Sequence, residues 1–193
     1  GTRISISGDV RLTTPKLKEG FAQGVLDTGI TVLDMGIAPT PANYFSMFHI
    51  EIDGAVQITG SHNPPEFNGF KLSYKQLPFY GEQIQTLRRL IENGDFDTGT
   101  GRIEEIDIMT PYQAMLEEKI SIEKPMKAVI DCGNAVACLS APYIFPSVGI
   151  ETYELYCNID GTFPNHHPDP TEDKNLMELV KIVKSGEFDF GVA

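Results

Sequence analysis

The sequence alternates between short apolar runs and longer segments of helical periodicity along most of its 193 residues. Apolar runs typical of strands predict β-structure at 3–7, 30–35, 54–59, 70–74, 126–131, 150–156 and 188–193. Helices are predicted at 13–29, 42–48, 82–94, 110–120, 135–149 and 175–186. Strands that alternate with helices form mainly parallel sheets, because each helix returns the chain to the same edge. The sequence therefore predicts an α/β fold with a mixed, mostly parallel sheet and helices on both faces.

Two of the predicted helices carry informative end signals. Thr13 or Thr14 can cap the helix at 13–29, and Gly29 suits its end. Its apolar face is predicted to contain Leu17, Phe21 and Val25. In the helix at 135–149, Pro142 and Pro146 are expected to limit or bend the helix.

The net charge, the hydropathy and the cysteine content argue against several classes of function. A net charge of −12 argues against nucleic-acid binding, which needs a basic surface, and no apolar window is long enough to span a membrane. The first residues do not resemble a signal peptide, because a strand-like run begins at once. The three cysteines are odd in number and form no C-x-x-C, so a zinc site or disulfide framework is not expected. Reduced thiols in a cytoplasmic protein are the expectation.

The loop after the predicted strand at 54–59 carries the residues best suited to chemistry. Ligands of such sheets lie outside the carboxyl ends of strands, and Ser61 follows such an end. Gly60 allows a ligand to approach the backbone, and Asn63 can hold the loop through backbone hydrogen bonds. A serine hydroxyl needs activation, which His62, Lys71 or an acidic metal site elsewhere can supply. The alternative is a turn-forming serine and asparagine beside a solvated histidine.

Several segments resemble the α-D-phosphohexomutase family, in which the serine of T-[AG]-S-H-N-P carries a phosphoryl group. TGSHNPPEFNGFK at 59–71 holds that serine motif. The other matching segments are GDVRLTTP at 8–15, GIAPTP at 36–41, VIDCGN at 129–134 and DGTFPNHHPDP at 160–170. The likeness covers nearly the whole chain and is greatest to the bacterial phosphomannomutase/phosphoglucomutase branch.

The resemblance implies specific roles. Ser61 would be the phosphoserine, exchanging its phosphoryl group with a hexose phosphate and supplying one ligand of a single Mg²⁺ ion through that phosphate. Lys71 would act as a cation and general acid or base, and His62 would build the polar loop. Arg11 and Asn63 would belong to the phosphate environment, although a surface ion pair is the alternative for Arg11. Mannose and glucose phosphates are the implied substrates, with a hexose 1,6-bisphosphate as intermediate and activator.

Other polar residues favour structural interpretations. His166 and His167 are flanked by prolines and are expected to shape an interdomain loop rather than ligate a metal. Asp131 and Asn134 stand at a predicted strand end, where a turn role is expected. Cys132 is expected to be a small core residue.

The chain also departs from the family pattern. Neither the family's early Y-D-I-R-G segment nor its D-G-D-x-D-R magnesium loop occurs within the 193 residues. We therefore expect residues 1–122 to be domain 1 without its start, and 123–193 to be part of domain 2, ending before the metal-binding loop. The remaining domains of the full-length chain would be partners, and this piece alone is expected to be inactive. Phosphoglucosamine mutase, or a catalytically silent binding or assembly module of the same fold, are the alternatives.

Overall fold

A computed structural model describes residues 2–193, and its packing divides the chain into two compact units. The first unit comprises the residues up to Asp9, together with Thr13–Thr59 and Asn68–Ile108. The second comprises Val10–Leu12, Gly60–Phe67 and Met109–Ala193. The family-domain boundary expected at 122/123 stays a prediction, because units defined by packing need not coincide with family domains.

The first unit contains a six-stranded sheet in the order β5-β4-β3-β1-β2-β6. Its strands are β1 (Arg3–Gly8), β2 (Thr31–Ile37), β3 (Gly54–Ile58), β4 (Phe70–Tyr74), β5 (Leu77–Phe79) and β6 (Ile103–Glu105). β3, β1, β2 and β6 are parallel, whereas β4 and β5 run antiparallel at one edge. The predicted mixed, mostly parallel sheet is therefore confirmed.

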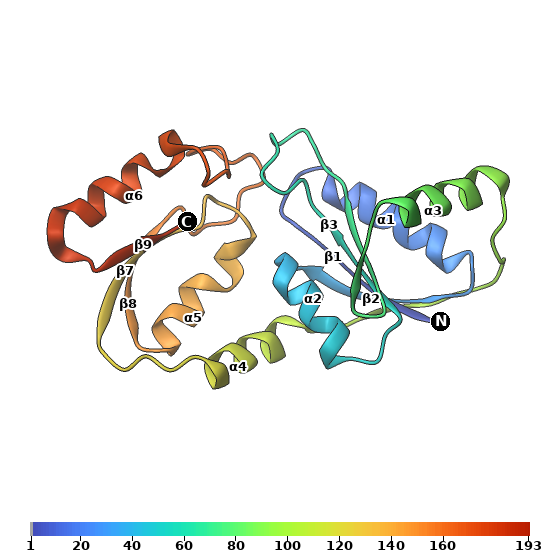
Figure 1. Ribbon diagram of the computed structural model, residues 1–193, viewed down its shortest axis with the longest axis horizontal. Helices are drawn as coiled ribbons and strands as arrows, with labels where there is room; N and C mark the ends of the chain where they lie inside the picture. The colour runs from blue at the N-terminus through green and yellow to red at the C-terminus, as the bar shows by residue number, and fades with distance from the viewer. Residues whose placement is uncertain (1) are drawn as a thin grey trace. The chain divides into compact units, whose positions relative to one another are not determined.

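The helices of the first unit are α1 (Thr14–Leu26), α2 (Thr40–His49) and α3 (Glu82–Asn93). Alternate residues of β1 face opposite sides of the sheet. Ile4 and Ile6 pack in the core cluster that includes the predicted α1 face, Leu17, Phe21 and Val25. Ser5 and Ser7 instead bond to Ser46 and Asn43 of α2. The prediction of helices on both faces is confirmed for this sheet (Figure 1).

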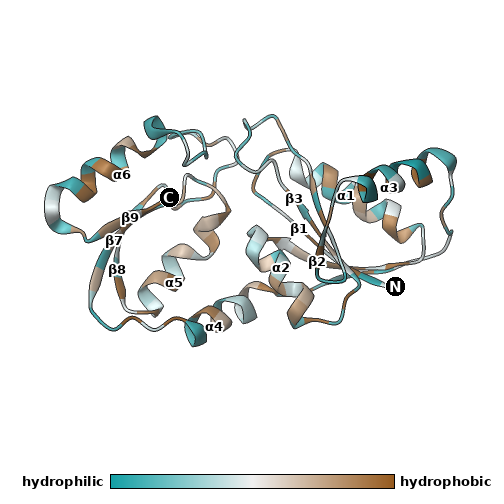
Figure 2. Ribbon diagram, in the orientation of Figure 1, coloured by the Kyte–Doolittle hydropathy of each residue, from teal (hydrophilic) through white to brown (hydrophobic). Residues whose placement is uncertain are grey.

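The second unit contains three parallel strands in the order β8-β7-β9. They are β7 (Met126–Asp131), β8 (Ile150–Leu155) and β9 (Phe190–Val192), and the longer helices are α4 (Met109–Lys119), α5 (Ala141–Ser147) and α6 (Met177–Ile182). α5 packs against β8 and α6 against β7 and β9, on opposite sides of the strands (Figure 1). α6 alternates between apolar and polar turns in Figure 2, because Leu179 and Ile182 pack beside Val129 in the core.

Some predicted elements differ in the structure. The helix predicted at 135–149 is divided into a 3₁₀ turn, η1 (Val136–Leu139), and α5. Pro142 lies in the first turn of α5, where proline is well accommodated, whereas Pro146 lies inside α5, one residue before its end. The helix predicted at 175–186 consists of a 3₁₀ turn, η2 (Asp173–Leu176), α6 and a π turn, η3 (Val183–Glu187).

Helix ends and short strands account for the other differences. α1 ends at Leu26 rather than Gly29, and the Thr13 side chain makes no capping bond. α3 ends before Gly94, as predicted, with that glycine in the left-handed conformation. β5 and β6 were not predicted, because strands of three residues carry no alternating pattern that can be recognised. Among the residues described, no helix combines the length and hydropathy needed to cross a bilayer.

Candidate active site around Ser61

Ser61 lies in an exposed loop three residues beyond the end of β3. Its φ angle is 54°, in the left-handed region that non-glycine residues rarely adopt. Such a conformation costs of order 1 kcal/mol or more and persists only where neighbouring contacts hold it. We therefore expect residues outside the loop to hold its backbone in this conformation.

Arg11 provides that support from beneath the loop. Its side chain is buried, with the residue only 2% exposed. Nη1 donates to the carbonyl oxygens of Pro64 at 2.6 Å and Phe67 at 3.0 Å. Nη2 donates to those of Ser61 at 2.8 Å and Asn63 at 2.7 Å. The alternative of a surface ion pair for Arg11 is wrong, because this guanidinium is buried and its four terminal protons bind loop carbonyls.

Gly60 and Asn63 complete the turn. A Cβ atom on Gly60 would lie 2.5 Å from Arg11 Cζ and 2.5 Å from the Phe67 carbonyl oxygen, so only glycine fits. The Asn63 backbone N–H and side-chain Nδ2 both donate to the Gly60 carbonyl, at 3.0 Å and 2.9 Å. Asn63 thus holds the loop in the way that its side chain chemistry suggested.

Residues 164–171 clamp His62 from a second loop of the same unit. His167 Nε2 donates to the His62 carbonyl oxygen at 2.8 Å. The His62 ring nitrogen Nδ1 lies 3.8 Å from Asp169 Oδ1. Hydrogen bonds from the Thr171 hydroxyl and backbone N–H lower the pKa of the Asp169 carboxyl, with smaller contributions from the two histidines. Asp169 is therefore a carboxylate that faces the His62 ring.

Asp131 anchors this second loop to the end of β7. His166 Nε2 lies 3.0 Å from Asp131 Oδ2, and the Asp131 side chain is 1% exposed. Asp131 Oδ1 also accepts a bond from the Gly133 backbone N–H at 2.9 Å. The Nδ1 atom of the His166 ring also lies 2.9 Å from the carbonyl oxygen of His167. This contact holds the backbone of His167, the residue that bonds to His62. The expected loop-shaping role of the two histidines is confirmed.

Asn134 completes the turn after β7. It has a φ of 57°, donates from Nδ2 to the Asn158 carbonyl at 2.8 Å and accepts from Asn165 Nδ2 at 2.7 Å. Its predicted turn role is confirmed. Contact between the serine loop and residues 164–171 was not predicted, because about a hundred residues of sequence separate them and no local pattern reports such a contact.

Lys71 lies in the first unit, on β4, and is exposed. Lys71 stands opposite Gln57 of β3 in the antiparallel pair, so the two side chains lie on the same face of the sheet. This is the face that α2 covers, since Gln57 donates to the carbonyl of Ala38, two residues before α2 begins. Ser61 lies in the second unit. Among residues 2–193, no group of three or more histidine, cysteine, aspartate or glutamate side chains is arranged to hold a metal ion.

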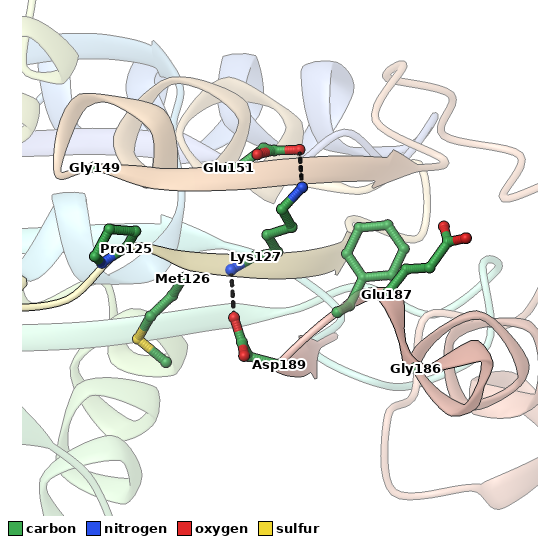
Figure 3. Close-up of a pocket in the computed structure, with 9 residues that line it drawn as sticks. Pro125, Met126, Lys127, Gly149, Glu151, Gly186, Glu187 and Asp189 are labelled. Carbon is green, nitrogen blue, oxygen red and sulfur yellow. Dashed lines mark hydrogen bonds and ion pairs between the residues drawn. The ribbon is translucent and has the colours of Figure 1, made fainter.

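A separate cavity of about 420 Å³ opens at the amino ends of β7 and β8 (Figure 3). Three of its charged residues are joined by hydrogen bonds: Lys127 Nζ donates to Glu151 at 2.9 Å, and the Lys127 backbone N–H donates to Asp189 at 2.7 Å. Asp131 lies at the other end of β7. This cavity is therefore distinct from the candidate active site.

Comparison with known proteins matches both halves of the chain. The family pattern described as phosphoglucomutase/phosphomannomutase, alpha/beta/alpha domain I, matches residues 1–98, and the corresponding domain II pattern matches residues 110–193. A protein of Pseudomonas aeruginosa named phosphomannomutase/phosphoglucomutase is 42% identical over 190 residues, covering 98% of this chain and 41% of that protein. A Neisseria meningitidis phosphoglucomutase is 41% identical over 194 residues, covering all of this chain and 42% of that protein.

A solved structure gives the same result. The crystal structure of a phosphoglucomutase/phosphomannomutase family protein from Burkholderia thailandensis superimposes with a TM-score of 0.95 at 37% identity. It covers 100% of this chain, which corresponds to 44% of the solved chain. The chain thus spans about two fifths of the length of the relatives it matches.

Proposed function

The chain belongs to the phosphoglucomutase/phosphomannomutase family, and from that premise we propose that the full-length protein interconverts hexose 1-phosphates and hexose 6-phosphates. The observation that supports this most strongly is the presentation of Ser61. Its side chain is exposed, while its backbone is held in a strained conformation by the buried Arg11. A loop without function has no evident need for such support, whereas a phosphoryl carrier must be positioned accurately.

In the proposed reaction, Ser61 Oγ carries the phosphoryl group. A sugar hydroxyl attacks that phosphorus, the bond from phosphorus to Ser61 Oγ breaks, and a hexose 1,6-bisphosphate forms. After the bisphosphate turns round, Ser61 Oγ attacks its other phosphoryl group, and the isomeric monophosphate leaves. The proton of the attacking hydroxyl passes to a general base and returns to the departing oxygen, so each turnover restores the phosphoserine.

The side chains around Ser61 take supporting roles in this proposal. Arg11 positions the phosphoserine backbone through its bonds to the loop carbonyls, rather than by binding the phosphate with its terminal nitrogens. His62 lies next to the phosphate and is oriented by His167 and Asp169. Lys71 is the proposed cation and general acid or base, because β4 pairs with the strand that leads into the serine loop.

The described part of the chain offers too few carboxylate ligands for the expected Mg²⁺ ion. Carboxylate oxygens are the usual ligands of Mg²⁺, and residues 2–193 contain no suitable cluster of three side chains. We propose that this segment supplies only the phosphate oxygen of Ser61 to the ion and that residues of the full-length protein outside this segment supply the carboxylates.

The names of the relatives support mannose and glucose phosphates as substrates over glucosamine phosphate. The three free cysteines support a cytoplasmic location. The test is turnover of mannose 1-phosphate and glucose 1-phosphate by the full-length protein. Ser61→Ala is expected to abolish turnover, and Ser121→Ala, at another exposed serine, to leave it unchanged. An active Ser61→Ala enzyme would exclude the phosphoserine mechanism, and inactivity of the wild type on both sugars would exclude this substrate class.

A further inference from the structure

The three cysteines, separated by up to 25 residues of sequence, gather at the carboxyl ends of β7 and β8. Cys132 directly follows β7, and Cys157 lies two residues beyond the end of β8. Their sulfur atoms lie 3.2 Å apart. The Cys132 thiol also shares a hydrogen bond with the thiol of Cys138. All three thiols are free.

Burial and hydrogen bonding give the three thiols different chemistry. Cys132 is buried, with 5% of its surface exposed, whereas Cys138 and Cys157 are partly exposed. The hydrogen bond between the Cys132 and Cys138 thiols lowers the pKa of Cys138 and raises the pKa of Cys132. Burial raises the pKa of Cys157. Cys157 is partly exposed, so a small oxidant can reach it from solvent, and the Cys132 sulfur lies 3.2 Å from the Cys157 sulfur. Because the thiolate is the reactive form and the pKa of Cys157 is raised, oxidation of Cys157 is expected to be faster at higher pH.

We infer that Cys132 and Cys157 form an oxidisable pair, which a hydroperoxide converts into a disulfide between the ends of β7 and β8. The Cys157 thiolate attacks one peroxide oxygen, the O–O bond breaks, and an alcohol or water leaves. The resulting sulfenic acid is attacked by the Cys132 sulfur, which loses its proton as water leaves. Two thiols and one hydroperoxide thus yield one disulfide, one water and one alcohol, or two waters from hydrogen peroxide.

The two sulfur atoms already lie close together, at 3.2 Å. An S–S bond is about 2.05 Å long, so the atoms must move closer by only about 1 Å. The strand ends are already joined, because the Cys132 N–H donates to the Leu155 carbonyl at 3.1 Å and the Asn134 N–H to the Tyr156 carbonyl at 2.8 Å. The disulfide would add a covalent link next to Asp131, the residue that anchors the loop around His62.

The experiment uses the reduced full-length protein, treated with hydrogen peroxide, quenched by alkylation and digested for peptide mass mapping. The expected product is a cross-linked peptide pair containing Cys132 and Cys157, lighter by two hydrogens and released by dithiothreitol. Cys157→Ser is expected to eliminate the cross-link. Cys138→Ser, at the neighbouring thiol, is the matched control and is expected to retain it.

Two results would overturn the inference. One is a disulfide that joins Cys132 to Cys138 instead. The other is full alkylation of both Cys132 and Cys157 at a peroxide concentration that oxidises free glutathione. Because the experiment detects a covalent bond rather than turnover, its result does not depend on the proposed mutase activity.

Discussion

Replacing Arg11 should release the serine loop while leaving the rest of the fold in place. Arg11 makes four hydrogen bonds to loop carbonyls from a guanidinium that is 2% exposed. Hydrogen bonds to charged groups contribute about 1.5–3 kcal/mol each. The sum overstates the effect, because the loop is exposed and water can reach the freed carbonyls. A realistic loss for Arg11→Ala is about 3–5 kcal/mol, below that sum, because it leaves neutral carbonyls that water can hydrate.

Arg11→Lys should recover only part of this loss. It keeps the charge, but a single ammonium cannot reproduce the planar fork that reaches the Ser61 and Phe67 carbonyls from different nitrogens. The chain has two compact units, so global unfolding is not an adequate two-state measurement of one loop. Native-state hydrogen exchange at the Asn63 and Phe67 amides, which bond within the loop, reports on it directly.

Opening of the loop is expected to become about a hundredfold more frequent or greater in Arg11→Ala, since about 1.4 kcal/mol corresponds to a factor of ten. The matched control is Arg88→Ala, at an exposed arginine paired with Glu92 within α3, where a loss below about 0.5 kcal/mol is expected. Loop amides that exchange within about 0.5 kcal/mol of wild type in Arg11→Ala would refute the positioning role of Arg11.

Three further predictions concern other parts of the chain. Asp131→Asn removes the charge that binds the His166 ring and should destabilise the second unit by about 1.5–3 kcal/mol in urea denaturation; a loss below about 0.5 kcal/mol would contradict this. Hydrogen bonds from Thr171 lower the pKa of Asp169, so their stabilisation is present above about pH 4 and lost as pH falls through the folded-state pKa. Thr171→Val should raise that pKa in a carboxyl NMR titration, and an unchanged midpoint would count against the assignment. The isolated 193-residue chain should show negligible turnover of mannose 1-phosphate, and turnover near that of the full-length protein would overturn the need for further domains.

Much of the fold could be predicted from local sequence patterns. The apolar runs at 54–59 and 126–131 correspond to β3 and β7, and the spacing of Leu17, Phe21 and Val25 identified the buried face of α1. The two strands were recognisable as continuous apolar runs, because a strand that is buried on both faces carries apolar residues at successive positions. The α1 face was recognisable because burial of one face of a helix imposes a period on the sequence. β5 and β6 are too short to show such a period. The helix at 135–149 was predicted as one element because its apolar content outweighed the proline signal.

The candidate site was only partly predictable for a different reason. Ser61, His62 and Asn63 are adjacent in sequence, so their motif could be recognised directly. The positioning role of Arg11 depends on contacts with residues at least fifty positions away, which no local pattern reports. The same holds for the His167 bond to the His62 backbone and for the contact between Cys132 and Cys157.

Peptide mass spectrometry of the full-length protein, after incubation with a hexose 1,6-bisphosphate, tests the central claim most directly. Ser61 is expected to carry one phosphoryl group, which should disappear when the protein is treated with excess hexose monophosphate. A protein that turns over substrate at full rate while Ser61 stays unmodified throughout would contradict the account.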